Sequence, residues 1–199
     1  MVQLIALSVW KHNGDAEPIR LAESLKLDNF SMWTRSGVKE NVTFACRTIV
    51  KRTEIGCRQT VGLTDIPYKV HVYVRYDGLT CVLVSDDDYP VRVAFGLISK
   101  TLNTFSEKVG DKWKRITKDQ EVEPPFMKED LTQFQDPNND KINKIQRDLD
   151  EIKDIMYKNI DELLKRGETL DALLDKSGDV SALSKQFYHK AKKQNSCCR

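Results

Sequence analysis

The sequence predicts an α+β protein, in which a small antiparallel sheet with flanking helices is followed by a long C-terminal helix. Three observations carry this prediction. Short apolar segments rich in β-branched and aromatic residues fill the first half of the chain. Two other segments in the same half place apolar residues at helical spacing. From Lys141 onward the chain contains no proline, and its apolar residues recur with a heptad period.

Four segments of the first half have strand character, and two more predict helices. The expected strands cover 4–10, 19–25, 68–76 and 80–86, and the expected helices cover 38–52 and 90–105. Turn residues at His12–Gly14 and at Asp77–Gly78 fit an antiparallel sheet, and the second is a good hairpin signal. We therefore expect residues 1–110 to form one folded domain.

Residues 111–137 differ in composition from the domain before them. They mix charged residues with the pair Pro124-Pro125 and with a further break at Pro137. We interpret them as a linker that contains one short helix near 127–135. Residues 138–199 then form the third part of the chain.

Composition excludes several functions. The 199 residues suffice for one domain and an extension. The chain is 31% charged with a formal net charge of +2, so no long-range field marks a nucleic-acid partner. None of the common catalytic motifs occurs, and His12, His71 and His189 are scattered. We predict that the protein is not an enzyme, with no catalytic residue, no metal site and no bound cofactor.

Any attachment of this protein to a membrane must be peripheral or through a covalent lipid. The apolar run near the N-terminus has no basic leader and no small-residue cleavage site, so it does not fit a signal peptide. No stretch approaches the roughly 20 apolar residues that a spanning helix needs. Five cysteines without framework spacing indicate a reducing compartment, and we expect a cytosolic protein.

The cysteines form two groups. Cys46, Cys57 and Cys81 are expected to be core or incidental thiols. Cys197 and Cys198 are adjacent and follow a lysine-rich stretch, which leaves three uses open: a disulfide, a metal site or nucleophile, and lipid attachment. A vicinal disulfide would be strained, and a reducing compartment disfavours it.

The last third of the chain carries a heptad seam, with apolar steps that alternate between three and four residues. This period predicts a left-handed coiled coil. The seam positions are Ile142, Ile145, Leu149, Ile152, Met156, Asn159, Leu163, Arg166, Leu170, Leu173, Ser177, Val180, Ser184, Phe187, Ala191 and Gln194.

Arg166 is the informative seam position. Leu163 lies three residues before it and Leu170 four residues after it, so the phase of the seam directs it into a bundle. A buried guanidinium offers five N–H donors and no acceptor, so partner helices must supply oxygens in that layer. The alternative is a solvated arginine on a marginal helix. Gly167 follows it, which suggests a segment that orders on meeting partners.

These residues resemble a known family. The stretch LLKRGETLDALLDKS (163–177) resembles the R-SNARE motif. The stretches TRSGVKENVTF (34–44), HVYVR (71–75) and DDYPVRVAFGLISKTLNTF (87–105) resemble the N-terminal longin domain. The tail QFYHKAKKQNSCC (186–198) resembles that of the YKT-type longin R-SNAREs, which are anchored by lipid. The resemblance covers nearly the whole chain in one order.

The resemblance implies a fold, a partner set and a form of regulation. It implies a profilin-like longin domain, whose five-stranded antiparallel sheet has helices on both faces. It places Arg166 in a central ionic layer with glutamines from three Q-SNARE helices, whose zippering would draw vesicle and target membranes together. It implies that the longin domain folds back over the SNARE motif, with Trp33, Val42 and Phe44 at the hydrophobic groove. Asn41 departs from the family pattern, which usually has phenylalanine there.

The resemblance also implies a lipid anchor. Cys197 matches the palmitoylated cysteine and Cys198 the prenylated one, and two lipid signals give stable attachment where one does not. Lys190, Lys192 and Lys193 would add attraction to an anionic leaflet, although a solvated face is the better interpretation for at least one of them. The expected location is the cytoplasm and the cytoplasmic face of Golgi, ER-derived vesicle and endosomal or vacuolar membranes.

The tail departs from the prenylation rule. Only Arg199 follows Cys198, so the sequence lacks a complete C-a-a-X box. We expect either a truncated or altered form or another route of lipidation.

Two alternatives from other classes remain. In the first, the seam homodimerises as a non-fusogenic coiled-coil tether or scaffold and the N-terminal domain recruits partners. Such a dimer would place two copies of Arg166 against each other without acceptors. In the second, the tail thiols carry out acyl transfer.

Overall fold

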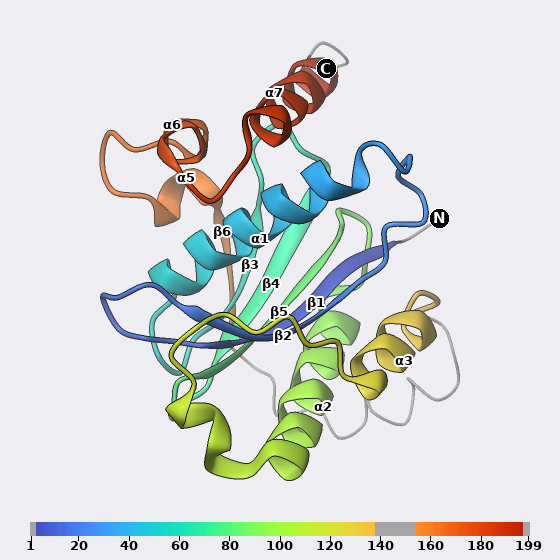
Figure 1. The fold of residues 1–199 in the computed structure, drawn as a ribbon, viewed down its shortest axis with the longest axis vertical. Coiled ribbons are helices and arrows are strands. Elements are labelled where there is room, and N and C mark those ends of the chain that lie inside the picture. The colour runs from blue at the N-terminus through green and yellow to red at the C-terminus, as the bar shows by residue number, and fades with distance from the viewer. Residues whose placement is uncertain (1–2, 138–153, 197–199) are drawn as a thin grey trace.

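The computed structural model describes residues 3–137 and 154–196 of the chain, and in it one mixed sheet separates two layers of helices (Figure 1). The elements follow in this order: β1 (Leu4–Lys11), β2 (Ile19–Leu25), α1 (Arg35–Arg52), β3 (Arg58–Gly62), β4 (Tyr68–Val74), β5 (Leu79–Asp86), α2 (Val91–Val109), the 3₁₀ helix η1 (Gly110–Arg115), α3 (Pro125–Gln133), β6 (Ile155–Asn159), α5 (Ile160–Leu163), α6 (Leu170–Lys176) and α7 (Ala182–Ser196).

The sheet has the strand order β2-β1-β5-β4-β3-β6. The first five strands pair antiparallel throughout, and β6 joins β3 in parallel. The five-stranded antiparallel sheet with flanking helices is therefore confirmed, with a sixth strand from the C-terminal part of the chain. At the β4–β5 hairpin, Gly78 has a φ of +86°, which explains why glycine occupies this predicted turn.

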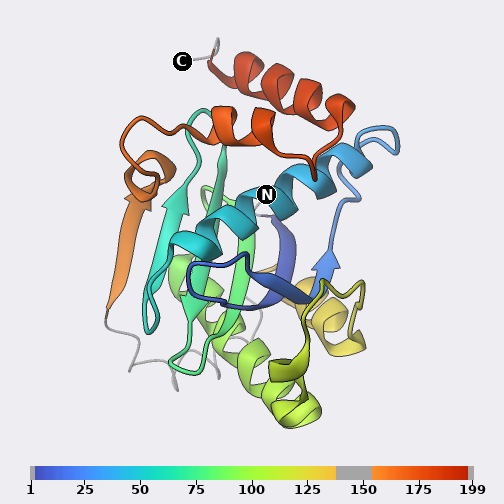
Figure 2. The ribbon, with the colours of Figure 1, turned by 60° about the vertical axis from the view of Figure 1, so that its left-hand side comes forward.

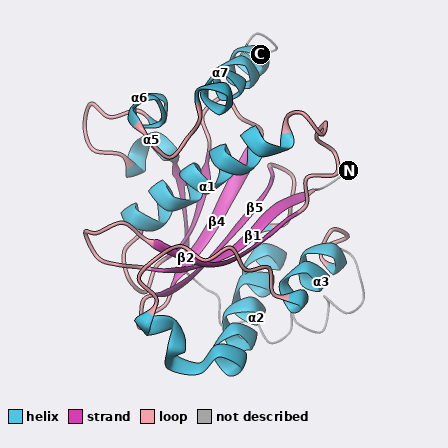
Figure 3. Ribbon diagram, viewed as in Figure 1, coloured by secondary structure: helices cyan, strands magenta, loops and turns pink. Residues whose placement is uncertain are grey.

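Helices cover both faces of the sheet, as Figures 2 and 3 show. One face packs against α2, η1 and α3, and the other packs against α1 and the C-terminal helices. Central strands such as β1 and β5 are therefore buried on both sides, which accounts for their nearly unbroken apolar runs. The core consists of two apolar layers, one on each side of the sheet.

The predicted linker 111–137 is instead part of the folded domain. Trp113, Met127, Leu131 and Phe134 are at most 3% exposed and belong to the core layer beneath α2. Residues 119–122 also cover the free edge of β2, where the Gln120 amide donates to the Arg20 carbonyl over 2.8 Å. Most charged residues of this segment face outward, although Asp130 is buried beside Lys100, and they outnumber the few apolar anchors, so composition alone indicated a linker.

Residues 154–196 do not form the single long helix predicted for them. They form β6 and three helices that wrap across the domain (Figure 2). The backbone breaks at Gly167, where φ is +87°, and Asn159 and Thr169 cap the helices that follow them. A lone helix would leave its apolar seam in water, so shorter segments that bury their apolar residues on the domain are favoured.

Candidate functional site: the interface between domain and C-terminal segment

The site is the surface where residues 154–196 pack on residues 3–137, which we call the closed interface. Its first component is β6, which extends the sheet by pairing each of its residues with β3, from Ile155 opposite Arg58 to Asn159 opposite Gly62. The Thr64 hydroxyl lies 3.0 Å from Asn159 Oδ1 and 2.8 Å from Asp161 Oδ2. These polar contacts fix the register at the point where strand turns into helix.

The second component is apolar. Six side chains of α5, α6, α7 and their connections enter the core layer beneath α1, and none is more than 9% exposed. They are Ile160, Leu164, Leu170, Leu174, Val180 and Tyr188. Val42 and Phe44 of α1 are half-buried against the same layer. Apolar burial is therefore the main force that holds the segment on the domain.

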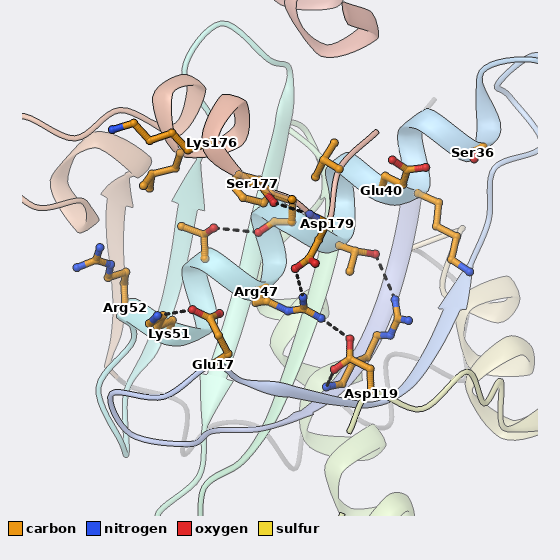
Figure 4. Close-up of a pocket in the computed structure, with 18 of the residues that line it drawn as sticks. Glu17, Ser36, Glu40, Arg47, Lys51, Arg52, Asp119, Lys176, Ser177 and Asp179 are labelled. Atoms are coloured by element: carbon orange, nitrogen blue, oxygen red, sulfur yellow. Dashed lines mark hydrogen bonds and ion pairs between the residues drawn. The ribbon is translucent and has the colours of Figure 1, made fainter. Parts of the chain in front are cut away.

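The third component is an ionic cluster on the outer side of α1, shown in Figure 4. Arg47 bridges two parts of the chain, because its guanidinium contacts Asp119 and also lies 3.3 Å from Asp179 of the C-terminal segment. Arg52 pairs with Glu168 over 2.8 Å. These pairs border a cleft of about 830 Å³ between α1 and residues 173–180. Each is partly solvated, so they contribute less than the apolar layer.

The fourth component is a close contact between α1 and α7. The Glu40 carboxylate accepts a 2.7 Å hydrogen bond from the Ser181 amide, which lowers the pKa of Glu40. One residue on, Asn41 Nδ2 donates over 3.0 Å to the Ser184 carbonyl. Gly37 lies opposite Ser184, where a Cβ would be 3.5 Å from Ser184 Oγ, an ordinary van der Waals distance. Asn41, which departs from the family pattern, thus makes a polar contact to α7.

Helices α6 and α7 form a hairpin held by polar pairs. Asp171 accepts hydrogen bonds from the Tyr188 hydroxyl at 3.0 Å and from Lys192 Nζ at 2.7 Å. Burial acts to raise the pKa of Asp171, but these two hydrogen bonds outweigh it and the net shift is downward. His189 pairs with Asp175 over 2.9 Å. These pairs therefore link α6 and α7 to each other independently of their contacts with the domain.

The predicted seam residues are distributed unevenly over this interface. Leu170, Val180 and Ser184 are buried; Leu163, Leu173, Ser177, Phe187 and Ala191 are half-buried; Met156, Asn159 and Gln194 are exposed. The positions that follow Leu163, Leu173 and Phe187 are the buried ones instead. The closed interface thus uses some seam residues together with residues that lie one position after the seam.

Several predicted residues take no part in the interface or lie outside the described residues. Arg166 is exposed in the turn between α5 and α6. Trp33 is 88% exposed and does not contribute to the covered surface, because the turn before α1 directs it outward. This differs from the expectation for Trp33 as a groove residue. Outside the described residues lie Ile142, Ile145, Leu149, Ile152, Cys197 and Cys198.

Glu40, Arg47 and Arg52 were missed by the sequence analysis. Helical periodicity marks the apolar face of α1, and these residues lie beside that face, where charge normally indicates solvent. Among the polar residues of α1 in the interface, only Asn41 stood out in the sequence, because it departs from the family pattern. Recognising the others requires the position of the C-terminal segment, which lies more than 100 residues away along the chain.

The cysteines that the structure describes include two buried core residues. Cys46 and Cys81 are buried, and burial raises the pKa of both thiols. Among the residues that the structure describes, no group of His, Cys, Asp or Glu side chains is arranged to hold a metal ion. In the described ranges we find no helix with the length and apolarity required to cross a bilayer.

The fold and interface define a class: an α+β domain with a C-terminal segment that carries a SNARE-type heptad seam and packs back on the domain. The family model described as a regulated-SNARE-like (longin) domain matches residues 22–128. The synaptobrevin family model matches residues 141–198.

Similar proteins of known family identify the subgroup of longin SNAREs to which this chain belongs. The VAMP-like protein YKT61 of Arabidopsis thaliana is 43% identical over 199 residues, which cover 99% of this chain and 98% of the relative. The synaptobrevin homolog YKT6 of Yarrowia lipolytica is 40% identical, with 92% of each chain covered. That of Saccharomyces cerevisiae is 36% identical, with 99% and 98% covered. The chain belongs to the YKT-type longin R-SNARE family, which is not a family of enzymes.

Proposed function

We propose that this protein is an R-SNARE that drives vesicle fusion in intracellular transport by forming a four-helix bundle with three glutamine-bearing SNARE helices. The observation that carries the proposal is the synaptobrevin match over residues 141–198, within which Arg166 falls on the heptad seam. Three glutamine side chains supply the acceptor oxygens that a guanidinium in the bundle requires. Because Arg166 is exposed in the closed structure, partner helices can reach it first.

The closed interface would restrain this activity. A segment cannot be strand β6 and a bundle helix at once, and Leu170 and Val180 cannot be buried both on the domain and in the bundle. The longin domain and the partner helices therefore compete for the same residues. We propose that the closed interface is the autoinhibited form and that bundle formation requires its release.

Membrane attachment would come from lipid on the tail. We propose palmitoylation of Cys197 and prenylation of Cys198, with Golgi, ER-derived vesicle and endosomal or vacuolar membranes as the sites of action. Two lipid chains are needed because a single lipid chain gives only marginal membrane binding. The protein would then cycle between a closed cytoplasmic form and a form anchored on the membrane surface.

Substitution of Arg166 tests the bundle. We expect Arg166→Ala to weaken the complex with three glutamine-bearing SNAREs by about 1–3 kcal/mol, because three buried amides lose their donor. The measurement is the thermal stability of the complex formed from purified proteins.

Lys165→Ala is the matched control, since Lys165 is equally exposed in the closed form but lies off the seam. We expect the control complex to be as stable as the parent complex. If Arg166→Ala forms a complex as stable as the parent one, the ionic-layer role is wrong. A homodimer of the isolated chain would support the tether alternative.

A further inference from the structure

Two parts of the chain bring exposed apolar side chains to one end of the α1–α7 pair. Met32 and Trp33, which directly precede the cap of α1, are 77% and 88% exposed, and Leu183 in the first turn of α7 is 73% exposed. The hydrogen bonds of Glu40 with Ser181 and of Asn41 with Ser184 hold these two helix ends together. In Figure 2 the beginning of α7 lies over the beginning of α1. We call Met32, Trp33 and Leu183 the end patch.

The turn that carries the patch is well fixed. The Thr34 amide donates over 2.9 Å to the Ser31 carbonyl, and the hydroxyls of the same two residues lie 3.0 Å apart. Arg35 Nε donates over 3.1 Å to the carbonyl of Phe30, whose ring is half-buried against the core. The turn therefore presents Met32 and Trp33 to solvent in a defined position, even though exposing them in water is unfavourable.

Cationic side chains lie beside the patch and along α7. Arg35 is two residues after Trp33 and donates hydrogen bonds to the backbone carbonyls of Phe30 and Asp28. Further along α7, Lys190 and Lys193 are exposed and pair with no acidic group in the described part of the chain. Lys192 differs, because it turns inward to pair with Asp171. The surface therefore combines apolar tips with positive charge.

We propose that the end patch and the outer face of α7 form a docking surface for an anionic phospholipid bilayer. Trp33, Met32 and Leu183 enter the interfacial region, where tryptophan is favoured, and the cations face the headgroups. The proposal rests on the proposed membrane function and deepens it, since a contact made by the protein itself would supplement a weak lipid signal. A protein partner would not require anionic lipid, and the test separates the two.

Trp33 provides a direct readout, because the other two tryptophans, Trp10 and Trp113, are 0% and 3% exposed. The full chain without lipid modification is titrated with vesicles of phosphatidylcholine that contain about 30% phosphatidylserine. We expect a blue shift of the emission and quenching by brominated acyl chains. Binding to vesicles of phosphatidylcholine alone should be at least about fivefold weaker.

Three variants keep Trp33 as the fluorescent reporter. We expect Leu183→Ser to weaken partitioning about fivefold, because it removes an inserting side chain. Ile55→Ser is the matched control, since Ile55 is 50% exposed just beyond the other end of α1, and it should leave partitioning unchanged. Lys190→Glu combined with Lys193→Glu should abolish the preference for anionic vesicles. Circular dichroism verifies that all variants remain folded.

An unchanged Trp33 emission at about 1 mM lipid would overturn the inference, as would equal losses in Leu183→Ser and Ile55→Ser. Equal binding to neutral and anionic vesicles would overturn the electrostatic part. The same preparations are tested for complex formation with glutamine-bearing SNAREs. Vesicle binding without a complex contradicts the proposed function alone, and a complex without vesicle binding contradicts this inference alone.

Discussion

Leu174→Glu should open the protein and increase its hydrodynamic radius. Leu174 is 1% exposed in the core layer beneath α1, where a carboxylate would lose the apolar contacts and be buried among apolar side chains. The substitution should cost the closed interface about 3 kcal/mol or more, which is over a hundredfold in the closed-to-open ratio. With the C-terminal segment released, we expect the radius measured by analytical ultracentrifugation to rise by roughly 20%.

The position of Leu174 makes this variant selective. It lies one residue after the seam position Leu173, so the bundle should tolerate a carboxylate there, and complex formation should become faster than for the parent. Ala172→Glu is the matched control, because Ala172 is exposed on the same helix and receives the same charge. An unchanged radius for Leu174→Glu, or an equal increase for Ala172→Glu, would contradict the closed interface as the controlling element.

Acid should destabilise the folded domain through His71. The imidazole is fully buried between β3 and β5, with Nδ1 2.9 Å from Thr60 Oγ1, Nε2 3.0 Å from Ser85 Oγ and the Phe95 ring edge-on. Burial, aided by Lys69, lowers its pKa to about 3. The unfolded chain binds a proton near the ordinary pKa of 6.5, so stability is complete above that value and falls as the pH decreases toward 3.

The expected loss between pH 7 and pH 5 is about 2 kcal/mol, since one proton contributes about 1.4 kcal/mol per pH unit. Asp86 at the end of β5 acts in the opposite direction at lower pH, because burial raises its pKa and protonation then favours the folded state. Urea denaturation of the parent and of His71→Gln at both pH values isolates the contribution. The His71→Gln variant should be less stable than the parent at pH 7, but its free energy of unfolding should change less between the two pH values. Equal pH dependence of stability in the two proteins would refute the assignment of the acid sensitivity to His71.

Most of the domain was predictable from local signals, although strand β3 was not among the predicted strands, whereas the closed interface was not predictable. The turn at Asp77–Gly78 and the helical periodicity of α1 and α2 depend on neighbouring residues, so pattern alone located them. The segment 111–137 escaped because its few apolar anchors are diluted by charge. Ile155–Asn159 becomes a strand only because the edge of β3 is available, and its own heptad pattern predicts a helix.

The candidate site follows the same division. The heptad seam, with Arg166 at its centre, is a regular pattern of apolar residues that can be recognised in the sequence alone. The closed interface uses Leu164, Leu174 and Tyr188, which lie beside the seam and look like ordinary apolar residues until the domain is placed against them. The segment therefore carries a regular heptad seam and further apolar residues beside it, and Leu170 and Val180 of the seam are also buried on the domain. Periodicity reveals only the regular pattern.

The central claim is that residues 155–196 exchange their packing on the domain for packing in the bundle. Hydrogen exchange on the full chain, alone and with three glutamine-bearing SNARE helices, tests it most directly. We expect the β3 amides facing β6 to lose protection on complex formation, while amides of residues 160–196 gain it. Unchanged protection of β3 in a fully formed complex would show that the segment does not leave the domain.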